Sequence, residues 1–96
     1  MKINDLEFEL TCSMFPEQYD VYKEDKQVGY VRLRWGCLSA EYPDVCGELI
    51  YEHQFEDLIG CFNDDTERMY YLTIISEAII KKENEVHYEK RINKTE

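Results

Sequence analysis

The segment from Glu41 to Glu67 contains no lysine and no arginine. Its nine acidic residues give it a charge of −9, close to the formal charge of −10 for the whole chain. Apolar side chains such as Ile50, Phe55 and Leu58 are interspersed among the acids, whereas a disordered acidic segment has few of them. The segment is therefore expected to form part of a folded surface with charge of one sign.

Features typical of membrane and nucleotide-binding proteins are also missing. No apolar run approaches the roughly 20 residues that span a bilayer, and the chain does not begin with basic residues followed by an apolar run. A cytoplasmic protein without membrane contact is therefore expected. The glycines are too widely separated for a phosphate-binding loop: Gly29, Gly36, Gly47 and Gly60.

The cysteines do not have the spacing of a metal site. No CxxC pair is present, and the gaps between successive cysteines are 25, 9 and 15 residues. Zinc ligands usually come in closely spaced pairs, so free thiols are expected, with no metal and no cofactor. A thiol-based sensor or metal binder that uses Cys37, Cys46 and Cys61 stays open as a third interpretation of the function.

Alternating apolar and polar residues predict an antiparallel sheet in the first part of the chain. In the first strand Phe8 and Leu10 point one way and Glu7 and Glu9 the other. We expect four strands, with a fifth allowed, and the polar residues 24–27 form a hairpin connection. The segments with strand character are Leu6 to Met14, Tyr19 to Lys23, Val28 to Trp35, Cys37 to Tyr42 and Glu48 to Phe55.

One amphipathic helix follows the predicted sheet. It is expected to run from about Asp65 to Lys82, with Asn63 or Asp64 as its N-cap. Its apolar stripe consists of Tyr71, Ile74, Ile75, Ala78 and Ile79.

Strands followed by a helix predict an α+β fold, with the helix packed on one face of the sheet. Residues 1–83 are expected to form a single domain. Residues 84–96 form a charged tail that suits either a strand or a continuation of the helix.

The predicted helix divides the sheet into a covered and an open face. The covered face should bear Phe8, Leu33, Trp35 and Tyr51. The open face should bear Arg32 and Arg34 together with the acids Glu7, Glu9, Glu48 and Glu52. Cross-strand ion pairs would make this face merely solvated. Alternatively, the surplus of carboxylates resembles the charge pattern of a nucleic-acid backbone and attracts basic clefts.

Catalysis is not expected. His53 falls on the core side of its strand, and spacing assigns it neither a nucleophile nor an orienting partner. Direct binding of DNA or RNA is not expected either, since the negative field repels phosphates. The residues expected to bind a partner protein are acidic: Glu7, Glu9, Glu48, Glu52, Glu56, Asp57, Asp64 and Asp65.

Three short sequence segments resemble those of a known group of proteins. Residues 28–34 (VGYVRLR), 41–44 (EYPD) and 67–72 (ERMYYL) resemble those of small uncharacterised acidic proteins from bacterial phages and conjugative elements. The resemblance implies an inhibitor of host defence that acts as a DNA mimic or by occupying an interface. It carries over no functional residue.

The expected function is therefore that of a small acidic protein-binding inhibitor without enzymatic activity. Its partner would be a basic, nucleic-acid-binding host protein. The alternative is a homo-oligomeric structural or accessory protein of a phage or mobile element, with Tyr30 and residues 86–92 forming an interface between copies.

Overall fold

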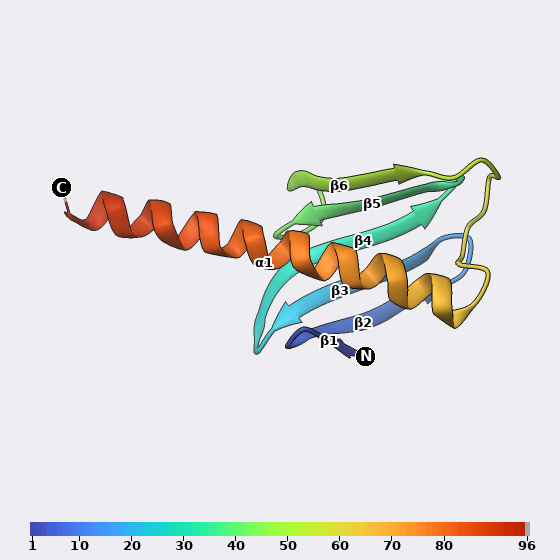
Figure 1. Ribbon diagram of the computed structural model, residues 1–96, viewed down its shortest axis with the longest axis horizontal. Helices are drawn as coiled ribbons and strands as arrows, with labels where there is room; N and C mark the ends of the chain where they lie inside the picture. Colours follow the sequence, from blue (N-terminus) through green and yellow to red (C-terminus); the bar gives the residue numbers. More distant parts are fainter. Residues whose placement is uncertain (96) are drawn as a thin grey trace.

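The computed structural model describes the backbone of residues 1–95 and the side chains of residues 1–88. Six antiparallel strands form one sheet in the order β1-β2-β3-β4-β5-β6, so every strand pairs with its neighbour in the chain (Figure 1). One helix, α1, follows the sheet. The α+β class is confirmed. The elements are β1 Lys2–Ile3, β2 Leu6–Ser13, β3 Glu17–Lys23, β4 Lys26–Arg34, β5 Cys37–Tyr42, β6 Glu48–Gln54 and α1 Asp65–Thr95.

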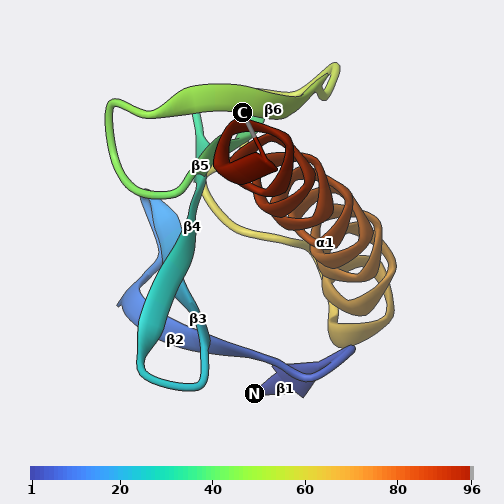
Figure 2. The same ribbon diagram turned by 90° about the vertical axis from the view of Figure 1, so that its left-hand side faces the viewer.

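The sheet curls around the helix. In Figure 2, viewed nearly along α1, β1 and β6 lie at the two ends of a curved sheet and the helix occupies its concave side. The core forms between these two layers, and its fully buried members come from both. They include Phe8, Val31, Leu33, Leu38 and Ala40 of the sheet and Leu72, Ile75 and Ile79 of the helix.

Gly29 lets the helix approach the sheet closely. A Cβ atom at this position of β4 would lie 2.7 Å from Cδ1 of Ile79, closer than van der Waals contact allows. The absence of a side chain at Gly29 therefore positions α1 across the middle of the sheet.

The strand count differs from the expected four or five because β1 is only two residues long. Such a short strand has no alternating pattern. Its hairpin partner is β2, with Ile3 opposite Leu6. The connecting residues Asn4 and Asp5 both have positive φ, 52° and 67°, as the central residues of a type I′ turn require.

The helix extends well beyond Lys82, where the sequence pattern placed its end. It continues to Thr95, so residues 84–95 are helical, and Glu96 lies outside the described residues. The apolar stripe ended near Ile79, but buried Glu83 and half-buried Val86 continue the face that packs on the sheet.

Two residues do not lie where the sequence pattern placed them. Trp35, expected in the core, is 66% exposed because it occupies the β4–β5 turn with φ of 52°. Glu48, expected on the open face, lies opposite Tyr42 on the helix side. An irregularity in the pairing of β5 with β6, between Ala40 and Glu41, shifts the alternation of β6 by one residue.

Candidate functional site

The convex face of the sheet carries a row of acidic side chains across four strands. Glu9 of β2 lies opposite Asp20 of β3, Asp20 opposite Tyr30 of β4, and Tyr30 opposite Glu41 of β5. Directly opposite residues have Cα atoms about 4.5–5.5 Å apart. Three carboxylates and one tyrosine therefore line up perpendicular to the strands, on the face away from α1.

Further carboxylates and two arginines complete this surface. We use "acidic face" for the outward carboxylates Glu7, Glu9, Asp20, Glu41 and Glu52. Arg32 and Arg34 point to the same side of β4. Within residues 1–88 neither arginine lies within ion-pair distance of a carboxylate. The cross-strand ion pairs of the first interpretation are therefore not formed by Arg32 and Arg34 among these residues, and the five acids of the face outnumber its two bases.

The negative field affects two titratable groups on the convex side. Partial desolvation, together with the charges of Asp20 and Glu9, raises the pKa of Tyr22 above its ordinary value. Burial and the neighbouring Glu52 raise the pKa of the Cys37 thiol, and Arg32 opposes them only in part. Both shifts disfavour a further negative charge on this surface.

The eight acids predicted to bind a partner do not form one site. Glu7 and Glu9 of β2 and Glu52 of β6 lie on the same acidic face, with three strands between β2 and β6. Glu56 and Asp57 lie apart from them, exposed in the loop between β6 and α1.

The remaining three predicted residues make intramolecular contacts near the helix. Glu48 forms an ion pair with Lys82 at 2.9 Å. Asp64 is the N-cap, because its side chain accepts a hydrogen bond from the amide of Glu67 at 2.8 Å. Asp65 pairs with Arg68 one turn further along.

Sequence reasoning missed Asp20 and Glu41 as members of the acidic face. Each lies between two buried residues of its strand, so its outward direction follows from alternation. Their alignment with Glu9 follows only from strand register, which hairpin geometry sets. Two signals were missing: a two-residue β3–β4 turn, with Lys23 opposite Lys26, where a four-residue connection was expected, and a register shift between Val21 and Tyr22 that moves Asp20 opposite Tyr30.

Two carboxylates inside the fold are also functionally relevant, because they fix the helix under the acidic face. Glu17, 1% exposed, accepts hydrogen bonds from Tyr19 Oη, the Phe62 amide and the Arg68 guanidinium. Burial alone raises the pKa of Glu17, but these donors, with Arg68 foremost, lower it below its ordinary value overall. This carboxylate therefore joins the start of β3 to the first turns of α1.

Glu83 makes a similar connection further along the helix. It is 3% exposed, accepts a hydrogen bond from Tyr42 Oη, forms an ion pair with Lys26 at 3.3 Å, and lies 3.5 Å from Nε2 of His87. Burial raises the pKa of Glu83, but the donors, led by Tyr42, lower it below its ordinary value overall. Tyr42 and Lys26 belong to β5 and β4, so Glu83 fastens the helix to the middle of the sheet.

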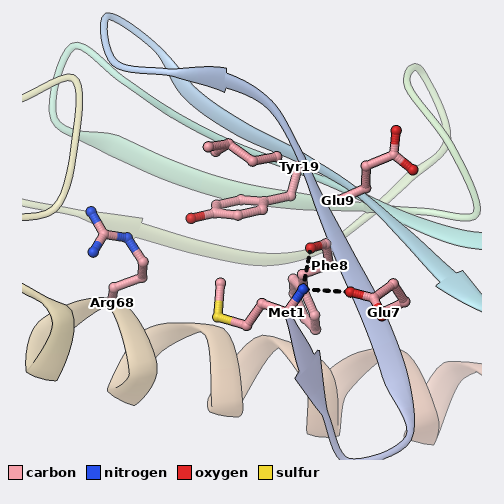
Figure 3. A pocket seen from close by; sticks show the side chains of 7 residues that line it. Met1, Glu7, Phe8, Glu9, Tyr19 and Arg68 are labelled. Carbon is pink, nitrogen blue, oxygen red and sulfur yellow. Dashed lines mark hydrogen bonds and ion pairs between the residues drawn. The ribbon is translucent and has the colours of Figure 1, made fainter.

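A hollow of about 630 Å³ opens beside β2, between the sheet edge and the helix (Figure 3). In Figure 3 the amino group of Met1 reaches the Glu7 carboxylate and the Phe8 carbonyl oxygen, at 3.2 Å from the latter. The Arg68 guanidinium is paired with Glu17 and Asp65. The Met1 amino group, Glu7 and Arg68 therefore bond to the protein itself, and the lining of this hollow contains no nucleophile paired with a base.

The cysteines and histidines do not form a reactive group in the described part of the chain. All four cysteines are free thiols, and no cluster of three or more His, Cys, Asp or Glu side chains within residues 1–88 is arranged to hold a metal ion. His53 packs against the rings of Phe55 and Tyr71, with centroid distances of 4.7 and 5.2 Å. This packing agrees with its expected place on the core side of β6.

No protein-family model, curated protein or solved structure matches the chain. Among the described residues, no helix has the length and apolar character needed to cross a membrane.

Proposed function

We propose that this chain is a non-enzymatic protein-binding inhibitor that presents the acidic face to a basic partner. The observation that carries the proposal is the row formed by Glu9, Asp20 and Glu41, with Tyr30 in its middle. Tyrosine supplies contact area at binding surfaces, and the flanking carboxylates supply charge.

Repulsion between carboxylates in this row destabilises the sheet. Glu9 and Asp20 are directly opposite, and like charges in that position destabilise a pair of strands. Neither carboxylate has an arginine or lysine within ion-pair distance among residues 1–88. Asp20 accepts a hydrogen bond from the uncharged Gln27 side chain at 3.3 Å. An arrangement that costs stability and has no cation among the described residues to neutralise it supports a role in recognition.

The proposed partner is a host protein that handles nucleic acid. A rigid surface with regularly spaced negative charges suits a cleft built for phosphates, where association is fast and sensitive to salt. Inhibition then consists of occupying the cleft. This also accords with the resemblance to small acidic proteins of phages and conjugative elements, which implies anti-defence activity.

The test is a pull-down from bacterial lysate with two variants of equal net charge. The first neutralises the acidic face by Glu9→Gln, Asp20→Asn, Glu41→Gln and Glu52→Gln. The control neutralises four exposed acids elsewhere: Glu24→Gln, Asp25→Asn, Glu77→Gln and Glu85→Gln. The bound proteins are eluted in salt steps and identified by mass spectrometry.

We expect the wild type and the control variant to retain a nuclease or another DNA-binding protein, which high salt or duplex DNA releases. The acidic-face variant should lose it. Equal retention by all three proteins would refute the proposal. Recovery of the bait alone, in a defined oligomer, would favour a homo-oligomeric structural or accessory protein instead.

A further inference from the structure

The β2–β3 turn, the β4–β5 turn and the β6–α1 loop meet at one end of the sheet (Figure 1), and each carries an exposed apolar side chain. Phe15 is 75% exposed, Trp35 is 66% exposed and Leu58 is 71% exposed. Met14, also exposed, precedes Phe15. We call Met14, Phe15, Trp35 and Leu58 the apolar platform.

Backbone hydrogen bonds hold the three loops of the platform together. The amide of Phe15 donates to the Gly60 carbonyl at 3.0 Å, and the amide of Gly36 donates to the Ile59 carbonyl at 2.7 Å. Both aromatic turns are thus fixed to the segment 57–60, which carries Leu58. The platform is preorganised, which lowers the entropic cost of binding.

The backbone conformation at Phe15 and Trp35 is also unusual for residues with large side chains. Phe15 and Trp35 have φ of 53° and 52°, a conformation that is uncommon for bulky residues. A Cβ atom at Gly60 would lie 2.6 Å from Cδ1 of Phe15, so glycine is required beside that ring. Strained positions of this kind concentrate at functional sites.

The charged residues next to the apolar platform indicate which kind of binding partner it suits. Two exposed acids, Glu56 and Asp57, directly precede Leu58, whereas one exposed cation, Arg34, directly precedes Trp35. A two-fold contact of the platform with a second copy of the chain would bring the acids of both copies into one interface, where they repel. A surface with an apolar pocket flanked by lysine or arginine would meet complementary charge.

We propose that the apolar platform is a second docking surface, which inserts Trp35, Phe15 and Leu58 into an apolar pocket with a basic rim on another protein. Exposed aromatic side chains on a rigid base are typical binding hot spots, and large exposed apolar patches mark interaction sites. This surface is separate from the acidic face and does not depend on its function.

A selection of binding peptides tests whether the partner of the apolar platform combines apolar and basic residues. Random 12-residue peptides displayed on phage are selected on the immobilised full-length protein and depleted on a Trp35→Asn/Leu58→Ser variant. Asparagine tolerates positive φ, so the change at Trp35 replaces the indole ring by a small polar side chain and keeps the turn. Thermal unfolding confirms that the variant folds.

We expect the enriched peptides to combine apolar residues with lysine or arginine. The affinity of a synthetic enriched peptide should fall about tenfold or more in Trp35→Asn. It should be unchanged in Val45→Ser, an exposed apolar side chain in the β5–β6 turn at the other end of the sheet, and in the acidic-face variant.

Three results would overturn the proposal. The first is the enrichment of peptides without basic residues, or of peptides that bind the depletion variant equally well. The second is a dimer in sedimentation that Trp35→Asn dissolves, since the occupant would then be a second copy. The third is binding to anionic lipid vesicles that depends on Trp35.

Discussion

At the scale of single residues, the two buried carboxylates are the most consequential side chains of the fold. Glu17 and Glu83 are each held by a tyrosine hydroxyl and a cation, and within residues 1–88 no buried polar side-chain atom lacks a hydrogen-bond partner. A buried charge is tolerated only with such compensation. Removal of one partner therefore costs more than the pair contributes.

Arg68→Met is expected to destabilise the protein by about 3 kcal/mol, because it leaves the Glu17 carboxylate buried without its cation. Urea denaturation measures the change in the free energy of unfolding. Lys81→Met, at an exposed lysine of the same helix, should change it by less than about 0.5 kcal/mol. Adding Glu17→Gln to Arg68→Met should restore part of the loss, and a further loss of stability would contradict this account.

Glu83 gives the protein a component of stability that acid removes. Its pKa in the folded state lies below the ordinary value of 4.5, so the unfolded chain takes up the proton first as the pH falls. The stabilisation is fully present above the pKa of the unfolded state and is lost as the pH falls through that of the folded state.

The stability difference between the wild type and Glu83→Gln should therefore be largest above about pH 5 and shrink below pH 4.5. Denaturant unfolding at a series of pH values measures it. Comparison with the variant cancels the effect of the other acids. A difference that grows on acidification would contradict the assigned pKa direction.

At the scale of the elements, alternation in the sequence predicts strands but not their irregularities. Leu38, Ala40 and Tyr42 alternate without interruption in the predicted strand from Cys37 to Tyr42, and all three are buried. Leu10 keeps the alternation, opposite buried Tyr19, but is 52% exposed and lines the hollow beside β2. The irregular pairing of β2 with β3 begins only after it, between Leu10 and Cys12. Bulges depend on contacts between strands, so a pattern read along one strand cannot reveal them.

The acidic face could likewise be predicted only in part, as far as alternation within single strands allows. Glu7, Glu9 and Glu52 were placed on the open face by alternation alone. Asp20 and Glu41 required the register across β2 to β5, and Glu48 was misplaced because of the irregular pairing of β5 with β6. The apolar platform had no sequence signal, because Trp35 in a strand-like segment resembles a core residue.

The opposed pair on β2 and β3 leads to a prediction for these elements. Glu9→Gln should stabilise the protein by about 0.2–1 kcal/mol at low salt, because it removes a like charge opposite Asp20. The gain should diminish as salt screens the repulsion. Thermal unfolding at low and high salt measures it, with Glu24→Gln in the β3–β4 turn as the control. Equal gains for both variants would indicate an effect of net charge alone.

The helix should divide into two parts in amide hydrogen exchange. Its buried positions Leu72, Ile75, Ile79 and Glu83 lie against the sheet, whereas its C-terminal part extends beyond the sheet in Figure 1. Amides of residues 69–83 should exchange at least about tenfold more slowly than those of residues 87–95, since local opening is easier without tertiary contacts. Uniform protection along α1 would show that the extension is stabilised in solution.

At the scale of the whole molecule, two surfaces of different chemistry lie on one rigid body. The acidic face occupies the convex side of the sheet, and the apolar platform occupies the end where three loops meet. The described part of the molecule is elongated, with extents of 50, 23 and 19 Å, largely because of the single helix. Both surfaces remain clear of α1, so engagement of one does not require movement of the helix.

The position of the helix after all six strands has a consequence for synthesis on the ribosome. The sheet emerges strand by strand, and each new strand finds its partner in the one before it. Its concave apolar side then has no cover while the 31 residues of α1 are translated, about 2–6 s at 5–20 residues per second. During that interval the nascent chain presents a surface that chaperones recognise. A message truncated within the helix yields a product that proteases remove.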